Sequence, residues 1–542
     1  MPSETPRALP VFPARGLARL FIRKSVEQMQ AEHESSGLRR SLSALNLTSL
    51  GIGCIIGTGI FVLTGRAAAD FAGPGIMISF VITGVLCAFV ALCYAELASM
   101  LPVSGSAYSY SYASMGEVVA WVMGLLLVLE YGLAASTVAV GWSSYMVSLL
   151  HDIGLHLPPQ FTAAPGVAVV EGGVTVAHGI VNLPAMGAIF AVTCLLVTGV
   201  QESATANNVV VAIKLSVVLA FIVVGAFFVD TANWFPLIPA EIPAPPAGTE
   251  RGTWADIWRA MHAVVTAQNT SHYGVGGIIT AAATIFFAYI GFEAVSTAGA
   301  EARNPARDMP IGIIGSLVIC TILYILTSAV LVGIVPYAQL DNPAPIAMAV
   351  NAMGMPWFAI LVKIGAIAGI SSVMLVLLYG QTRIFYTMAR DGLLPAAFAR
   401  VHPRFRTPWI DTIIVGIVAA GFSGLMSLDA LVDLTNVGSL AAFAMVCLTV
   451  LYLRAVAPGL KRPFRAPFYP FVPVFGAAMC LFLLMSLMAN TATRHFFMIY
   501  LAGGMVVYFA YGIRNSKLAR GEIVMGAEPS MDLPRKLDTS SQ

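Results

Sequence analysis

Apolar runs long enough to cross a bilayer recur along almost the whole chain, and they limit the possible folds more than any other feature. A membrane-spanning helix needs about 20 mainly apolar residues. Of the 542 residues, 58% are hydrophobic and only 10% are charged, whereas soluble domains carry about 25% charged residues. The sequence therefore predicts an all-α polytopic membrane protein with 12 transmembrane helices, at about 46–68, 74–100, 118–149, 180–200, 207–229, 276–299, 311–336, 355–389, 409–427, 430–455, 468–489 and 495–513.

The distribution of basic residues orients these spans, because cytoplasmic loops carry an excess of Lys and Arg. With a cytoplasmic N-terminus, 23 of the 29 Lys and Arg residues fall on the cytoplasmic side. The outer side receives only Arg66, Arg251, Arg259 and Arg494, while Lys214 and Lys363 lie within spans. We expect a multi-pass protein of the cell inner (plasma) membrane with both termini in the cytoplasm.

The segments outside the spans are short. Residues 1–44 form a polar, basic cytoplasmic segment with no signal peptide expected, and Leu17, Leu20 and Phe21 in it predict either an amphipathic helix on an anionic lipid surface or a plain soluble helix. Residues 45–514 form one transmembrane domain and 515–542 a cytoplasmic tail. The outer segments 151–179 and 230–275 are expected to be loops with at most a short helix.

Several function classes lack their chemical groups. The seven cysteines all fall in apolar segments without a CxxC pair, so neither a disulfide framework nor a metal site is expected. No HExxH or P-loop motif is present, and no basic patch interleaved with aromatics indicates a nucleic-acid partner. We expect no enzyme activity and no cofactor.

The stretch 51-GIGCIIGTGIFVLTG-65 is rich in glycine, the weakest helix former apart from proline. One explanation is the GxxxG spacing of Gly53 and Gly57, which lets helices pack closely. The other comes from a second irregular segment in the sixth span, 286-FFAYIGFEAVSTAGAEARNP-305. Interrupted first and sixth spans point to an inverted repeat of five plus five helices with a binding site at the membrane midplane.

Broken helices suit a zwitterionic ligand. A half-helix N-terminus offers free N–H groups and a positive dipole end to a carboxylate, and the opposite half-helix ends in carbonyls that can accept from an ammonium. Two such breaks facing one another would recognise the backbone of an α-amino acid.

Four motifs carry a resemblance to a known family: GIGCIIGTGIF, FFAYIGFEAVST followed by EARNPARDMPIGI, 94-YAELASMLPVSGSAYSY-110 and 379-YGQTRIFYTMARDGLLP-395. Over about residues 35–515 the chain resembles the amino acid–polyamine–organocation (APC) superfamily, and within it bacterial relatives of the cationic amino acid transporters (CAT family). The resemblance implies the LeuT fold, with repeats at about 45–230 and 275–455 and two further helices at about 468–513. It also implies secondary active transport of amino acids by alternating access.

The resemblance also implies site residues. The substrate carboxylate would lie on the backbone around Ile55, Gly57, Thr58 and Gly59. The amino group would face the carbonyls of Phe287, Ala288 and Ile290, with Phe287 also serving as an aromatic gate.

Lys214 lies about 10 Å inside the fifth span. Its ammonium could snorkel to the interface, or it could be buried in the bundle, where burial favours the neutral amine and release of a proton. The resemblance places Lys214 where sodium-coupled relatives hold a cation, so that its ammonium would bond first-span carbonyls near Gly53. We therefore predict proton coupling through Lys214 rather than sodium coupling.

Two acidic residues within spans need an explanation, because an ionised carboxylate in the membrane requires a partner or a wet cavity. Glu130 either faces the side-chain end of the substrate or is protonated and packed. Glu293, in the broken sixth span, is predicted to gate or brace that helix.

The sequence leaves the substrate open between cationic and small neutral L-amino acids. The main prediction is proton-coupled uptake. The alternatives are an amino acid exchanger without ion coupling and a transporter-like amino acid sensor. No feature indicates an accessory subunit or an oligomeric state.

Overall fold

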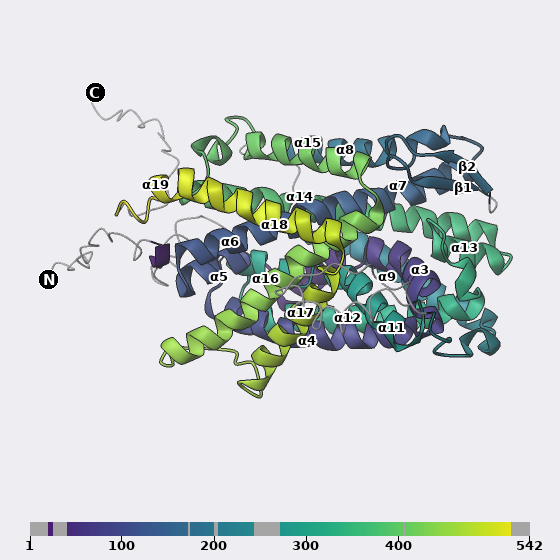
Figure 1. Cartoon of the computed structure of the whole chain (residues 1–542), viewed down its shortest axis with the longest axis horizontal. Helices are drawn as coiled ribbons and strands as arrows, with labels where there is room; N and C mark the ends of the chain where they lie inside the picture. Colours follow the sequence, from purple (N-terminus) through teal and green to yellow (C-terminus); the bar gives the residue numbers. More distant parts are fainter. Residues whose placement is uncertain are drawn as a thin grey trace, which may run out of the picture.

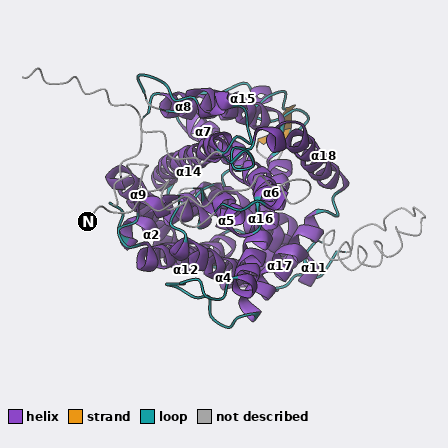
Figure 2. Ribbon diagram, turned by 90° about the vertical axis from the view of Figure 1, so that its left-hand side faces the viewer, coloured by secondary structure: helices purple, strands orange, loops and turns teal. Residues whose placement is uncertain are grey.

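The computed structural model describes residues 20–24, 41–103, 105–171, 174–199, 204–242, 272–405 and 407–521. These residues form a bundle of helices that run mainly along the long axis of the molecule (Figure 1). Seen along that axis, the helices pack into a rounded bundle (Figure 2). The amphipathic pattern predicted near the N-terminus lies mostly outside the described residues.

The first half of the chain contains these helices and strands, with η marking short 3₁₀ or π segments: α2 (Ala44–Ile55), η2 (Gly59–Leu63), α3 (Thr64–Ala67), η3 (Ala68–Ala72), η4 (Gly73–Gly75), α4 (Ile76–Met100), α5 (Ser106–Ser114), α6 (Glu117–Val128), η5 (Leu129–Leu133), α7 (Ala134–Asp152), η6 (Pro159–Phe161), β1 (Ala168–Glu171), β2 (Val174–His178), α8 (Leu183–Val197), α9 (Ala204–Gly225), η7 (Ala226–Phe228) and η8 (Thr231–Trp234).

The second half contains α11 (Gly274–Ile285), η9 (Phe286–Tyr289), η10 (Glu293–Glu301), α12 (Pro305–Ile334), η11 (Tyr337–Gln339), α13 (Pro345–Ala352), α14 (Pro356–Arg390), η12 (Ala396–Ala399), α15 (Trp409–Leu425), α16 (Leu428–Val456), α17 (Phe471–Leu487), α18 (Thr491–Val507), η13 (Tyr508–Gly512) and α19 (Ile513–Asn515).

Eight helical stretches among the described residues are long and apolar enough to cross a membrane: Gly59–Met100, Glu117–Asp152, Asn207–Phe228, Gly274–Glu301, Pro305–Ile334, Pro356–Arg390, Leu428–Val456 and Thr491–Asn515. Shorter apolar helices occupy Ala44–Ile55, Leu183–Val197, Trp409–Leu425 and Phe471–Leu487. A polytopic membrane protein is therefore confirmed, and the count of twelve crossings stays a prediction.

The extramembrane segments differ in detail from expectation. The segment 151–179, which is predicted to lie outside, contains an antiparallel pair of strands, β1 and β2, besides the short turn η6. The short helices α5 and α13 were also not expected, because both are much shorter than the run of about 20 apolar residues that marks a span. In Figure 1, α5 and α19 lie at one end of the bundle, whereas the hairpin and α13 lie at the other. Segments predicted to share a side of the membrane therefore share an end of the molecule.

Two helices are interrupted in the middle of the bundle. The first stops at Ile55, where Ile56 is extended with φ −74° and ψ 98°, and helical structure resumes at Thr58. The sixth predicted span narrows to the 3₁₀ segment η9, opens at Ile290 with ψ 130°, and continues as η10. Gly291 between them has φ +124°, which L side chains rarely adopt.

Helix α12 supports both interruptions. It packs along α4 and α2 and also contacts η10. Its buried side chains include Leu317, Tyr324 and Leu331. On the other side of the bundle, α14 packs against α7 and α9. The space between these two groups of helices contains the candidate site.

Candidate functional site

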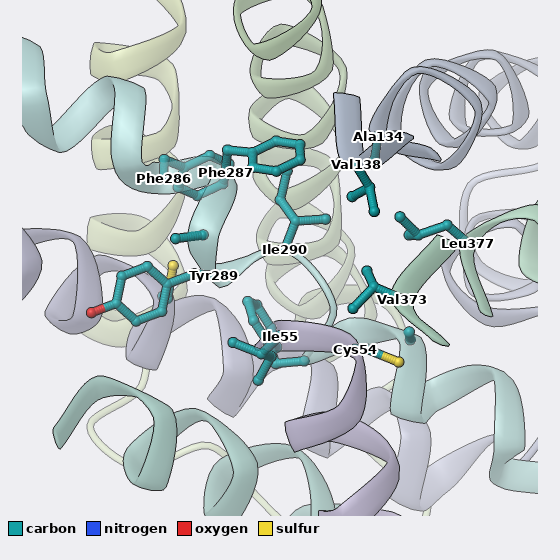
Figure 3. Packing of buried hydrophobic residues seen from close by; sticks show 14 of the residues in the cluster. Cys54, Ile55, Ala134, Val138, Phe286, Phe287, Tyr289, Ile290, Val373 and Leu377 are labelled. Carbon is teal, nitrogen blue, oxygen red and sulfur yellow. The ribbon is translucent and has the colours of Figure 1, made fainter. Parts of the chain in front are cut away.

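The two interruptions meet at a small cavity. Its lining consists of Cys54, Ile55, Gly57, Thr58, Ala134, Val138, Phe287, Ile290, Val373 and Leu377. Figure 3 shows Phe287 and Ile290 on one side, Val138, Val373 and Leu377 on another, and Cys54 and Ile55 below. The cavity volume is about 10 Å³, which is about the room that one water molecule needs. The site is thus closed in this conformation.

Five of the seven residues that the resemblance implied for substrate binding line this cavity: Ile55, Gly57, Thr58, Phe287 and Ile290. The other two, Gly59 and Ala288, instead bring the two interruptions into contact. A methyl group at Gly59 would lie 2.3 Å from the Cα atom of Ala288. Glycine is therefore required here by the close approach of two backbones, and Gly59 lies outside the GxxxG pair of Gly53 and Gly57.

A second close contact ties the interruptions together on the other side of the cavity. A methyl group at Gly291 would lie 2.8 Å from the carbonyl carbon of Cys54. The unwound part of the sixth span therefore rests directly on the end of α2.

Tyr324 on α12 was missed by sequence reasoning. Its hydroxyl oxygen lies 2.7 Å from the Ile55 carbonyl oxygen and 3.0 Å from that of Ala288, so its single proton is shared between carbonyls of both interruptions. The residue is fully buried. A tyrosine inside an apolar span carries no pattern that reveals such a contact.

Lys214 on α9 is fully buried and does not reach the interface. Its Nζ donates to the Gly53 carbonyl at 2.6 Å and to the Ile56 carbonyl at 3.1 Å. These carbonyls belong to the end of α2, where the interruption leaves them without helical partners. The Lys214 side chain therefore satisfies carbonyls at the broken end of the first span.

Glu130 and Glu293 do not line the cavity. Both are fully buried, and their carboxyl groups interact with each other. The Glu293 carboxylate also accepts the Gly291 N–H at 2.7 Å, so it braces the unwound backbone of the sixth span.

At the end of the bundle that contains α5, a short N-terminal segment closes over the helix ends. Lys24 pairs with Asp391 at the end of α14 at 3.0 Å, and both side chains are buried. Tyr108 donates to the same carboxylate at 2.9 Å, and the Glu117 N–H donates to the Ile22 carbonyl at 3.1 Å. This contact, which we call the Lys24 clamp, covers the end of α14 opposite to α13.

Comparison with known proteins identifies the chain. The sequence pattern of the amino acid permease family matches residues 42–511. The chain belongs to this family. This permease is 44% identical to the methylthioribose transporter of Bacillus subtilis over 93% of its own length and all of the relative. It is 43% identical to the branched-chain amino acid permease BcaP of Bacillus subtilis over 92% of its length and 99% of the relative.

More distant similarity extends to eukaryotes. The vacuolar cationic amino acid transporter 4 of Arabidopsis thaliana is 37% identical over 78% of this permease and 64% of the relative. The predicted membership of the APC superfamily is confirmed, and the protein is a transporter rather than an enzyme.

Proposed function

We propose that this permease is a secondary active transporter that takes up L-amino acids together with protons by alternating access. The observation that carries the proposal is the meeting of two interrupted helices at one cavity, with a buried lysine on the broken end of the first. The eight long helices and four shorter apolar ones support twelve crossings and the LeuT fold with its two repeats.

Backbone groups would recognise the substrate. The half-helix that resumes at Thr58 begins at the cavity, which Gly57 and Thr58 line. Its first N–H groups would be available there to a carboxylate, which would also gain from the helix dipole. Phe287 and Ile290 face this half-helix across the cavity, and their backbone would receive the amino group. The Ala288 carbonyl already accepts from Tyr324, so it takes part through packing in this closed conformation.

The closed cavity defines one stage of the cycle. Since an α-amino acid is several times larger than water, the cavity must expand before a substrate can enter. Phe287 stands between the interruption and the apolar wall, which suits its predicted role as a gate. Expansion on alternate sides of this point would give alternating access.

The walls favour a neutral, apolar substrate side chain over a cationic one. Every described side chain that lines the cavity is uncharged, and Ala134, Val138, Val373 and Leu377 form an apolar wall. A charged side chain placed there would lose its hydration without gaining a partner. The name of the relative BcaP, a branched-chain amino acid permease, agrees with this choice, whereas the name of the methylthioribose transporter supplies a second candidate substrate.

Lys214 would couple transport to protons. While protonated, it holds the Gly53 and Ile56 carbonyls and keeps the broken end of α2 in place. Loss of the proton would leave a weaker neutral donor, so α2 would be free to move and open one side. No sodium ion is required at a place where an ammonium already satisfies the carbonyls.

Glu130 and Glu293 would then act on the gate rather than on the substrate side chain. We propose that the protein lies in the inner membrane of the cell with both termini in the cytoplasm. The Lys24 clamp would then lie on the cytoplasmic side.

Uptake into liposomes that contain the purified protein tests the proposal. Radiolabelled leucine, alanine, arginine and methylthioribose would each be offered under an inward proton gradient and, separately, under an inward sodium gradient. Proton-driven accumulation of leucine or alanine is expected. Exchange without any gradient effect would favour an uncoupled exchanger, and binding without flux would favour a sensor.

A further inference from the structure

The pair formed by Glu130 and Glu293 is the most unusual buried group in the described part of the chain. Glu130 lies in η5, a π-helical turn between α6 and α7, and Glu293 begins η10. Within the described ranges, neither Glu130 oxygen has a hydrogen-bond partner, and the same holds for Oε1 of Glu293, although the two carboxyl groups interact electrostatically with each other. Among the described residues, no ion pair involves either carboxylate.

Two adjacent carboxylates in a dry interior cannot both remain charged without a cation, because each loses its hydration and repels the other. The two lysines of the spans do not neutralise them, since Lys214 bonds the carbonyls of α2 and Lys363 pairs with Asp152 at 2.5 Å. The pair must therefore hold a proton.

The hydrogen bond to the backbone shows which member stays charged. The Gly291 N–H donates to Oε2 of Glu293 at 2.7 Å, and such a bond stabilises the ionised form of the acceptor. Glu130 has no backbone donor of this kind. We infer that Glu130 and Glu293 form a proton-binding site. Glu130 carries the proton and donates a hydrogen bond to the Glu293 carboxylate.

Polar groups from several elements face this site. The hydroxyls of Tyr94 and Tyr131 are buried and have no hydrogen-bond partner in the described part of the chain, and both phenol groups interact electrostatically with the two carboxyl groups. The titratable and polar groups that face the pair or its tyrosines are Cys54 on α2, Tyr94 and Cys87 on α4, Tyr110 on α5, Tyr131 on η5 and Ser439 on α16.

The site is connected to both interruptions. Gly291, which donates to Glu293, also rests against Cys54 at the end of α2. If the proton leaves, two charges face each other, and the repulsion drives η10 away from η5 and draws water between them. Occupancy of the site thus controls how firmly the unwound part of the sixth span is held. Its contribution to transport rests on the proposed function, whereas the presence of the proton does not.

Infrared spectroscopy of the purified protein in lipid tests the inference directly, since a protonated carboxyl group has a C=O stretch that carboxylates lack and that shifts in D₂O. The difference spectrum between wild type and Glu130→Gln is expected to show the loss of one such band near neutral pH. In Glu293→Gln the band should persist but shift, because Glu130 keeps its proton and donates to an amide instead of a carboxylate.

Glu96→Gln provides the matched control. Glu96 is also buried, but its carboxylate pairs with Arg454 at 2.5 Å and with Arg462 at 3.4 Å, and it accepts the Ala466 N–H at 2.8 Å. Removal of a carboxylate that is paired in this way should change no carboxylic acid band. A spectrum unchanged by Glu130→Gln would overturn the inference, and loss of the band in Glu293→Gln with retention in Glu130→Gln would reverse the assignment.

Transport measurements separate this inference from the proposed function. Glu130→Gln imitates the protonated acid, so tracer exchange should remain while stimulation of uptake by a proton gradient is lost. If wild-type uptake does not respond to a proton gradient but the infrared band is present, the proton-binding site stands and the proposed coupling fails.

Discussion

Replacement of Lys214 tests the central proposal most sharply. Its ammonium donates two hydrogen bonds to the broken end of α2, at 2.6 and 3.1 Å. A hydrogen bond that involves a charged group contributes about 1.5–3 kcal/mol net. The two bonds together therefore stabilise the held position of α2, relative to the released one, by about 3–6 kcal/mol. Dehydration of the ammonium offsets part of this sum. Taking the lower bound of about 3 kcal/mol, loss of both bonds shifts the balance between held and released α2 by about 100-fold.

Two substitutions separate the bonds from the proton. Lys214→Met keeps the volume and removes both bonds, so accumulation driven by a proton gradient should fall by at least about tenfold, allowing for that offset, while exchange of labelled substrate continues. Lys214→Arg keeps a charge that cannot be lost at physiological pH, so substrate should still bind while proton-driven uptake stops. Both would be measured in proteoliposomes, with binding followed by a scintillation proximity assay.

Lys363→Met serves as the control, because it removes the other lysine within a span. Lys363 pairs with Asp152 rather than with the carbonyls of α2, so this variant should lose stability but keep its response to the proton gradient. Full proton-driven uptake by Lys214→Arg would refute the reasoning, since a side chain that never releases its proton could not be the coupling group.

Three further outcomes are expected. Tyr324→Phe removes the hydroxyl that joins carbonyls of both interruptions and should lower the free energy of unfolding by about 1–3 kcal/mol, measured by thermal unfolding in detergent; an unchanged melting temperature would contradict this role. Gly59→Ala places a methyl group against backbone and should abolish substrate binding, whereas Gly187→Ala, where nothing lies within 4 Å, should bind as wild type does; equal binding by both variants would show that the close approach is not needed. Lys24→Ala leaves Asp391 buried without its cation and should cost about 3–5 kcal/mol. The same change should speed thiol labelling of a cysteine introduced at the end of α14, and an unaltered labelling rate would show that the Lys24 clamp does not restrict access.

The sequence alone determined the class of the protein and where its helices are interrupted. Long apolar runs require helices, because backbone groups in lipid must be satisfied within the segment, and each predicted span corresponds to helical structure in the described residues. The glycines around Gly57 and the irregular segment at Gly291 marked both interruptions, since unwound dihedrals and close backbone approach favour glycine.

The partners of the buried groups were decided only by the tertiary structure. Snorkelling and burial of Lys214 were equally compatible with its position along α9, because depth along one helix does not fix which helices surround it. Tyr324 and the apolar wall that includes Val373 come from spans distant in sequence, and no periodic pattern links them to the interruptions. The contact between Glu130 and Glu293 likewise depends on how η5 and η10 pack. The position of a residue within its own span determines its depth in the membrane. The packing between spans determines which charge, carbonyl or cavity that residue faces.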